Sequence, residues 1–199
     1  MNRRNLLQSS LAASLLPAAA QAAPRAKTLV IYFSRADENY GVGVVSRGNT
    51  AVLADIVAGL LGDVPMFEVR AKAPYPKVYS ECTDLAKAEQ RRRARPELAK
   101  DFTRLDEFDT ILLGFPTWWG DLPMPLFTFL EQHPLDGKTI LPFNTHEGSG
   151  FGRTLSSLAR LCPKARIKEG YETTGQSAQN NREASRRELA DWLKAQGIL

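Results

Sequence analysis

Cysteine and histidine are scarce in this chain. Its 199 residues include two cysteines, Cys82 and Cys162, and two histidines, His133 and His146. The cysteines form no CxxC pair and the histidines do not cluster with them, so the sequence predicts no metal site of the usual ligand spacing. An oxidising compartment would permit a disulfide between Cys82 and Cys162, whereas two buried free thiols fit the sequence at least as well.

A strong charge of either sign is also missing. The chain has 26 basic and 22 acidic residues and a formal net charge of +4, which falls to +2 when Arg3 and Arg4 are left out. A mildly basic balance is not the footprint of a nucleic-acid-binding protein, so we expect no nucleic-acid partner. The one basic cluster, Arg91–Arg95, precedes Pro96, and we interpret it as the solvated face of a helix.

Long apolar runs are missing as well. The candidate nearest the N-terminus, Leu6–Ala20, is too short and too rich in Ala and Ser to span a bilayer stably. It follows Arg3 and Arg4 and precedes Ala20-Gln21-Ala22, an order typical of a signal peptide and its cleavage site. The sequence therefore predicts a signal peptide over residues 1–22, a mature domain over residues 23–199, and no stable membrane insertion of that domain.

The adjacent arginines resemble a twin-arginine export signal. That route carries proteins across the membrane already folded, so a cofactor can be loaded before export. We therefore expect a periplasmic location for the mature chain. An ordinary secretory signal and an uncleaved N-terminal anchor stay open as alternatives.

Short apolar runs alternate with longer amphipathic segments through the rest of the chain. The first run is rich in β-branched and aromatic residues, as in a strand buried on both faces. Such alternation predicts an α/β fold, a doubly wound parallel sheet with helices on both faces, and no linker divides it. We expect strands at Thr28–Phe33, Val64–Val69, Asp109–Phe115, Thr139–Asn144 and Ala165–Tyr171, and helices at Thr50–Leu61, Tyr79–Arg95, Met124–Gln132, Gly152–Leu161 and Asn181–Gln196.

The connection between the first strand and the first helix has the composition of a phosphate site. The strand ends in Ser34, and the helix begins at Gly48-Asn49-Thr50. Unpaired N–H groups at a helix N-terminus favour an anion, and Ser34, Asn49 and Thr50 add side-chain donors. A helix cap without a ligand is the alternative.

The loop after the third strand carries two adjacent tryptophans. It reads Pro116-Thr117-Trp118-Trp119-Gly120 and follows the carboxyl end of its strand, where open parallel sheets bind ligands. Neighbouring side chains of an extended segment point in opposite directions, so we expect one tryptophan to face the core and the other to stack on a ligand ring. The alternative is that both plug the end of the sheet.

The loop after the fourth strand is rich in glycine and polar groups. It reads Thr145-His146-Glu147-Gly148-Ser149-Gly150. The glycines would let the backbone approach a ligand closely, and the hydroxyl and main-chain N–H groups would bind the polar edge of a ring. We interpret His146 as a structural hydrogen-bonding residue and predict no catalytic side chain.

Together these segments resemble the flavodoxin family, in the branch with a lengthened phosphate loop. The likeness covers nearly all of the mature chain. It rests on Y-F-S-R at Tyr32–Arg35, G-N-T at Gly48–Thr50, P-Y-P at Pro74–Pro76, E-C-T at Glu81–Thr83, A-R-P-E-L at Ala94–Leu98, G-F-P-T-W-W-G at Gly114–Gly120 and T-H-E-G-S-G at Thr145–Gly150.

The resemblance implies a parallel sheet of order 2-1-3-4-5 and a non-covalent FMN that carries the electrons. It implies that a peptide near Gly120 can turn toward the flavin and so tune its potential. The implied phosphate contacts are Ser34, Arg35, Gly48, Asn49 and Thr50. The implied ring contacts are Pro116, Thr117, Trp118, Trp119 and Gly120 on one side, and Thr145, His146, Glu147, Gly148, Ser149 and Gly150 on the other.

One segment departs from the family's pattern. Ala36–Arg47 separates Ser34-Arg35 from Gly48, where other flavodoxins close the loop within a few residues. We expect this insert to fold out and back over the site, and Arg35 or Arg47 to pair with the phosphate. The chain also lacks the acidity usual in electron-carrying flavodoxins, so no particular partner is implied.

The predicted function is FMN-based electron transfer in the periplasm, with a redox partner protein or a small electron acceptor. Two alternatives stay open. One is an FMN-dependent reductase of a small acceptor such as a quinone, with a pocket formed in part by Asp37–Val45. The other is a non-redox module that keeps the fold and binds a ligand or a protein partner.

Overall fold

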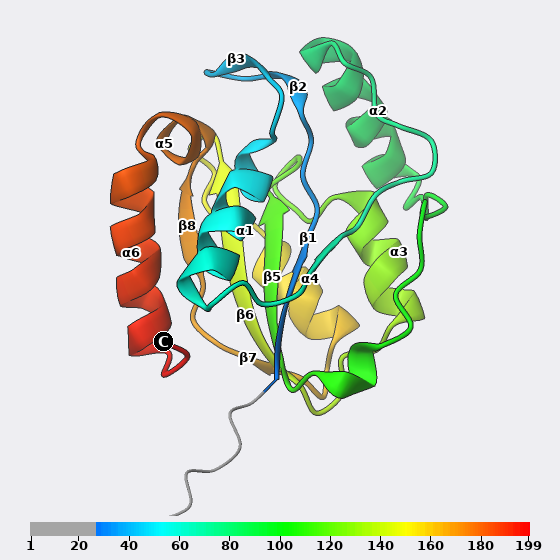
Figure 1. Ribbon diagram of the computed structural model, residues 1–199. Helices are drawn as coiled ribbons and strands as arrows, with labels where there is room; N and C mark the ends of the chain where they lie inside the picture. The colour runs from blue at the N-terminus through cyan, green and yellow to red at the C-terminus, as the bar shows by residue number, and fades with distance from the viewer. Residues whose placement is uncertain (1–26) are drawn as a thin grey trace, which may run out of the picture.

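The computed structural model of the protein describes residues 27–199, so the predicted signal peptide lies outside the described residues. A parallel sheet forms the centre of the molecule (Figure 1), in the order β4-β1-β5-β6-β7 with β8 also paired to β6. This confirms the doubly wound parallel sheet and its order. The strands are β1 (Thr28–Tyr32), β4 (Met66–Glu68), β5 (Thr110–Pro116), β6 (Thr139–His146), β7 (Arg166–Ile167) and β8 (Tyr171–Thr174).

Two short strands share the last position of the sheet, where a single strand was expected. β7 pairs with Thr139 and Ile140 at the start of β6, and β8 pairs with Phe143–His146 at its end. Pro142 lies between these stretches and has no N–H to give to the ladder. A Cβ on Gly170, between β7 and β8, would lie 2.9 Å from the Pro142 carbonyl oxygen, so the close passage requires glycine.

Helices cover both faces of the sheet (Figure 1). On one face lie α1 (Asn49–Leu60), α5 (Gly175–Asn180) and α6 (Arg182–Ala195), and on the other lie α3 (Met124–Gln132) and α4 (Thr154–Leu161). β1 serves both cores: its residues 29 and 31 pack with α3 and α4, and its residues 30 and 32 pack with α1 and α6. Burial on both faces explains why this strand is apolar at consecutive positions.

Three elements lie apart from this sandwich. The insert forms an antiparallel hairpin of β2 (Asp37–Asn39) and β3 (Gly43–Val45), and α2 (Tyr79–Arg91) lies close to it above the sheet (Figure 1). A short 3₁₀ turn, η1 (Leu105–Glu107), precedes β5. The helix expected over Tyr79–Arg95 ends early because Arg93 has a φ of 51° and leaves the helical conformation.

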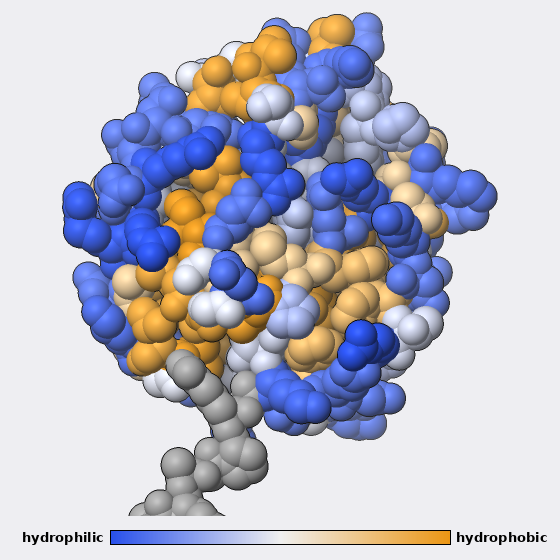
Figure 2. Space-filling model, in the orientation of Figure 1, coloured by the Kyte–Doolittle hydropathy of each residue, from blue (hydrophilic) through white to orange (hydrophobic). Residues whose placement is uncertain are grey.

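In the view of Figure 2, hydrophilic side chains predominate around the periphery, and apolar side chains are visible across the middle of the face. Apolar side chains gather at its top, over the β2–β3 hairpin, where Val44 is 81% exposed. No helix within residues 27–199 is long and apolar enough to cross a membrane.

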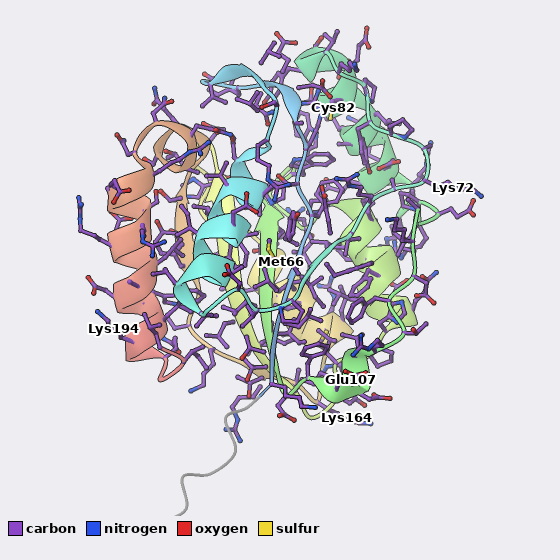
Figure 3. The ribbon with its side chains drawn as sticks, viewed as in Figure 1. Met66, Lys72, Cys82, Glu107, Lys164 and Lys194 are labelled. Carbon is purple, nitrogen blue, oxygen red and sulfur yellow. The ribbon has the colours of Figure 1, made fainter. Side chains whose placement is uncertain are left out.

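Both cysteines are free and buried in the described structure. Cys162 belongs to the core beneath α4, whereas Cys82 lies on α2 near the hairpin (Figure 3). The structure therefore bears out the free-thiol alternative. Burial raises the pKa of each thiol to about 11.

Candidate functional site

Three loops and the hairpin meet at the carboxyl edge of the sheet. The loops follow β1, β5 and β6, and α2 lies across from them. Between them is a cavity of about 230 Å³. Its walls come from Arg35, Asn39, Tyr40, Asn49, Tyr79, Cys82, Thr83, Ala86, Pro116, Thr117, Trp118, Trp119, Thr145, His146, Glu147 and Ser149.

The start of α1 forms a tight cradle at one end of the cavity. Ser34 Oγ accepts a hydrogen bond of 3.0 Å from the N–H of Ala51, so the end of β1 caps the helix. A Cβ on Gly48 would lie 2.3 Å from both Ser34 Oγ and the Arg35 carbonyl oxygen, which excludes any side chain. Within the described residues, the N–H groups of Asn49 and Thr50 in the first turn have no acceptor and are available to an anion.

A side chain from α5 fixes the shape of this cradle. Gln179 Nε2 donates to the Arg47 carbonyl oxygen at 2.7 Å and to Asn49 Oδ1 at 3.0 Å. Thr50 Oγ1 and Thr145 Oγ1 lie 2.7 Å apart in a buried hydrogen bond that joins the cradle to the loop after β6. The cradle is therefore held in place by the fold before any ligand arrives.

Neither arginine of the loop offers an unpaired guanidinium to a phosphate. Arg35 donates to the carbonyl oxygens of Pro76, Lys77 and Glu38. Arg47 pairs with Asp55 at 2.6 Å, and this hydrogen bond is the main cause that raises its pKa above the usual value. The expectation that one of them pairs directly with the phosphate gains no support, although Arg35 does line the cavity.

The insert folds back over the site, as expected. Asn39 Nδ2 donates to the carbonyl oxygens of residues 35, 36 and 37, which closes the base of the hairpin. At the tip, a Cβ on Gly41 would lie 3.6 Å from Glu147 Oε2. Glu38 Oε2 accepts a hydrogen bond of 2.7 Å from the N–H of Tyr79, so the hairpin is also tied to the start of α2.

The two tryptophans form a tight turn that separates their side chains. Trp119 and Gly120 have φ values of 51° and 74°, and the N–H of Asp121 donates to the Trp118 carbonyl oxygen at 3.0 Å. Positive φ at both central residues defines a type I′ turn, in which tryptophan is strained. The turn therefore holds Trp119 in a conformation that its side-chain contacts must stabilise.

The two tryptophan side chains of this turn have different surroundings. Trp118 packs edge-on against Phe33 and Tyr75, with ring centroids 5.1 Å and 5.0 Å away. Trp119 is 45% exposed, and its Nε1 donates to the Thr83 carbonyl oxygen at 2.8 Å. Trp118 packs against the core, as expected of one of the two rings, and both rings line the cavity. Stacking of a ring on a ligand stays a prediction.

One peptide of the turn is held much less firmly than the next. The Gly120 carbonyl oxygen accepts from the N–H of Arg153 at 2.8 Å, so the Gly120–Asp121 peptide is bonded at both ends. Among residues 27–199, the Trp119 carbonyl oxygen accepts only from the side chain of Gln90, at 3.2 Å. If a peptide here reorients, it is the one between Trp119 and Gly120.

The loop after β6 is held by its own side chains and by its neighbour. Asn144 Nδ2 donates to Thr117 Oγ1, which in turn donates to the Gly150 carbonyl oxygen at 2.7 Å. His146 Nδ1 accepts from the N–H of Gly148 at 3.0 Å, which is the kind of structural hydrogen bond that the sequence predicts for this residue. Burial raises the pKa of the Glu147 carboxyl, while a hydrogen bond from the Gly175 backbone partly offsets the shift.

A family model described as flavodoxin matches residues 27–196. The chain belongs to the flavodoxin family. A search of curated proteins found no match.

Solved flavoproteins have the same fold as this flavodoxin-family chain. A protein of Bacteroides eggerthii described as a flavoprotein is 25% identical with a TM-score of 0.68, over 85% of this chain and 97% of that one. One of Bacteroides uniformis is 28% identical with a TM-score of 0.65, over 86% and 99%. A flavoprotein of Lactobacillus acidophilus, solved in complex with FMN, is 20% identical with a TM-score of 0.58, over 78% and 97%, and shows the likeness of fold alone.

The residues present fit the phosphorylated planar cofactor that a flavodoxin implies. The cradle has no room for a side chain at Gly48 and presents free N–H groups at a helix start. Aromatic and polar side chains of two loops line the rest of the cavity. Of the sixteen predicted site residues, ten line it: Arg35, Asn49, Pro116, Thr117, Trp118, Trp119, Thr145, His146, Glu147 and Ser149.

The other six predicted residues shape the loops rather than the cavity wall. Ser34, Gly48 and Thr50 hold the cradle through the contacts described above. Gly120, Gly148 and Gly150 all have positive φ and form turns.

Sequence reasoning expected the insert Asp37–Val45 to form part of a pocket, but it did not single out which residues of the hairpin line the cavity, and it missed the wall from α2. Cys82 and Ala86 stand four residues apart on a helix, a spacing that gives a small apolar face and could have pointed to a close neighbour. The lining residues that it did not single out are Asn39, Tyr40, Tyr79, Cys82, Thr83 and Ala86.

Proposed function

We propose that this flavodoxin-family protein binds a non-covalent FMN in the cavity and uses it to transfer electrons. The observation that carries the proposal is the cavity itself, which joins a helix N-terminus with free N–H groups to a tryptophan turn and a glycine-rich loop. The Lactobacillus acidophilus flavoprotein, crystallised with FMN on the same fold, supports it. When bound, FMN would supply the one- and two-electron chemistry.

The protein's own part would be to bind and orient the cofactor. The N–H groups of Asn49 and Thr50 would hold the phosphate, with Ser34 and Gly48 fixing their direction. Trp119 and Thr117 would flank one side of the ring, and the backbone of 145–150 the other. No side chain has to act as acid or base for this role.

One feature of the cavity supports the reductase alternative as well. An electron carrier needs an exposed cofactor edge and a partner protein, whereas a reductase needs a pocket for its acceptor. Here the hairpin and α2 add walls beyond the two loops of the family's usual site. This is a specific reason to consider reduction of a small acceptor as the second candidate function.

Export to the periplasm is part of the same proposal. Arg3 and Arg4 precede the apolar segment in the order of a twin-arginine signal. Replacing both by lysine should leave the protein in the cytoplasm with its cofactor bound, as cell fractionation would show. Unchanged delivery to the periplasm would overturn the twin-arginine route.

The first test of the function is the visible absorption spectrum of the purified chain, with the released cofactor identified after denaturation. A yellow protein that releases stoichiometric FMN is the expected result. A colourless protein that also fails to bind added FMN would refute the redox function and favour the non-redox binding module.

A further inference from the structure

The cavity has an outer wall that the two cofactor loops do not supply. Tyr40 of the hairpin and Tyr79 of α2 have ring centroids 6.0 Å apart and planes inclined by 40°. Cys82 and Ala86, both buried, continue this wall one and two turns along α2. The wall is therefore aromatic at its rim and small and apolar below.

Exposed apolar side chains concentrate around this wall. The described residues include seven large apolar side chains that are exposed, and five of them belong to the hairpin, the start of α2 and the tryptophan turn. Tyr40 is 62% exposed, Tyr79 37% and Trp119 45%. Exposed aromatic residues gathered at the mouth of a cavity are typical of a surface that binds a ligand.

The tyrosine hydroxyl groups offer hydrogen bonds that the fold does not use. Within residues 27–199, neither the Tyr40 nor the Tyr79 hydroxyl has a hydrogen-bond partner, whereas Tyr75 and Tyr171 donate to Glu89 and Glu188. Burial, and next the charge of Glu147, raises the pKa of Tyr79, so its hydroxyl keeps its proton. Both hydroxyls are therefore available as donors to a ligand oxygen.

The charged side chains of the cavity already have partners. Arg35 is bonded to the carbonyl oxygens of Pro76, Lys77 and Glu38, and the Gly175 backbone gives Glu147 a hydrogen bond. Among the described residues, Arg35 is thus the one lysine or arginine that lines the cavity, and its guanidinium is occupied. Lys87 of α2 lies outside the lining, with its Nζ 4.3 Å from the centroid of the Trp119 ring. An uncharged ligand fits this wall better than an anionic one.

We propose that Tyr40, Tyr79 and the adjoining face of α2 form a subsite for a planar, uncharged aromatic ring that carries carbonyl oxygens, the class to which quinones belong. The flat rings of the wall would stack on the ligand, and the tyrosine hydroxyls would donate to its carbonyl oxygens. That the ligand is an electron acceptor rests on the proposed function. The subsite itself is made of residues that need no cofactor to be in place.

The test is a binding measurement on the FMN-loaded, oxidised full chain. Duroquinone is the probe, because its ring has no free carbon to which a thiol could add, and saturation-transfer NMR gives its Kd without any turnover. Tyr79→Phe keeps the ring and removes the hydroxyl, and we expect it to raise the Kd about fivefold, the effect of one neutral hydrogen bond. Tyr79→Leu also removes the aromatic face and should raise the Kd about tenfold or more.

A matched control distinguishes binding of duroquinone in the cavity from nonspecific binding to the exposed apolar side chains around it. Val44 is exposed on the same hairpin and does not line the cavity, so Val44→Ser should leave the Kd of duroquinone unchanged. Thermal unfolding confirms that each variant folds, and absorbance reports its FMN content.

Three results would overturn the subsite. The wild-type chain could fail to bind duroquinone up to its solubility limit, the Tyr79 variants could bind it as the wild type does, or those variants could weaken FMN instead of duroquinone. If the chain holds no FMN, the same titration is made without it. Binding of duroquinone that depends on Tyr79 would then support the subsite although the proposed redox function fails. Absence of duroquinone binding would refute both the subsite and the redox function.

Discussion

Arg35 illustrates how a residue can line a candidate ligand site while its guanidinium is bound by the protein itself. Its guanidinium donates to carbonyl oxygens of the segment before α2 and of the hairpin, so it braces two walls of the cavity. We expect Arg35→Gln to weaken FMN and riboflavin about equally, by about tenfold, because hydrogen bonds to a charged group are worth about 1.5–3 kcal/mol. Fluorescence titration with the two flavins measures both affinities.

The ratio of the FMN affinity to the riboflavin affinity shows whether Arg35 supports the cavity walls or contacts the phosphate. Loss of a phosphate contact would weaken FMN and leave riboflavin, which has no phosphate, unaffected. Gly48→Ala gives the reference for such a loss, because its Cβ would enter the cradle 2.3 Å from Ser34 Oγ. A change in ratio for Arg35→Gln like that of Gly48→Ala would show that Arg35 binds the phosphate after all.

The two thiols make a second prediction at the scale of single residues. Burial raises the pKa of Cys82 and Cys162 to about 11, so at pH 8 only a small fraction of either is thiolate. We expect the native protein to react with an aromatic disulfide reagent about a hundredfold more slowly than a free thiol. Denatured without a reductant, it should show two thiols, and finding none would mean that the cysteines are joined.

Residue identity alone explains only part of this site. Gly48, Asn49 and Thr50 could be assigned from sequence because a helix start has a local signature. The role of Arg35 could not be assigned in this way, since the carbonyl oxygens that its guanidinium binds lie about forty residues further along the chain. A positive charge beside a phosphate loop suggests a phosphate ligand, and only the folded chain shows that carbonyl oxygens satisfy it.

At the scale of elements, the tryptophan turn combines strain with a loosely held peptide. Gly120 has a φ of 74° and open space where a Cβ would be, so Gly120→Ala should cost about 1 kcal/mol from backbone strain alone. Gly137 has the same φ and the same open space in a turn before β6. Gly137→Ala should therefore cost about as much in chemical denaturation.

The two variants should differ in flavin binding. Gly120→Ala disturbs the turn that carries Trp119 and should weaken FMN several-fold, whereas Gly137→Ala should leave FMN affinity at the wild-type value. Equal FMN affinities for the two variants, with equal losses of stability, would show that the turn does not contact the cofactor.

The sequence predicts the long buried strands of the fold but not its short elements. The apolar runs of β1, β5 and β6 predict buried strands because burial on both faces needs apolar residues at every position. The hairpin β2–β3 and α5 have no such pattern, and their positions depend on contacts across the fold. Gln179 of α5 reaches the carbonyl oxygen of Arg47, and Glu38 of β2 reaches the N–H of Tyr79.

At the scale of the whole molecule, the topology could be predicted from the sequence, and the outer wall of the cavity only in part. Right-handed crossovers between parallel strands leave few sheet orders, and the observed order is among them. The carboxyl-edge rule then locates the site. The sequence predicts that the insert folds over the site, but no general rule says which of its side chains, or which helix outside the sheet layers, lines the cavity. Tyr40 and Tyr79 are therefore assigned to the site only once the structure is known.

Cofactor binding should stabilise the entire domain, because the cavity joins loops from both halves of the sheet. A ligand at a hundred times its Kd stabilises the native state by about 2.7 kcal/mol, and for a domain of this size that raises the Tm by about 5–10 °C. We expect this shift for the wild-type chain with excess FMN in a thermal unfolding experiment. Gly48→Ala should lose most of the shift because its Cβ would collide with Ser34 Oγ and the Arg35 carbonyl oxygen, both 2.3 Å away, and so distort the cradle. Gly62→Ala, at a positive φ with open space at the end of α1, should lower the starting Tm yet keep the shift. An equal shift in all three proteins would show that FMN does not use the cradle at the start of α1.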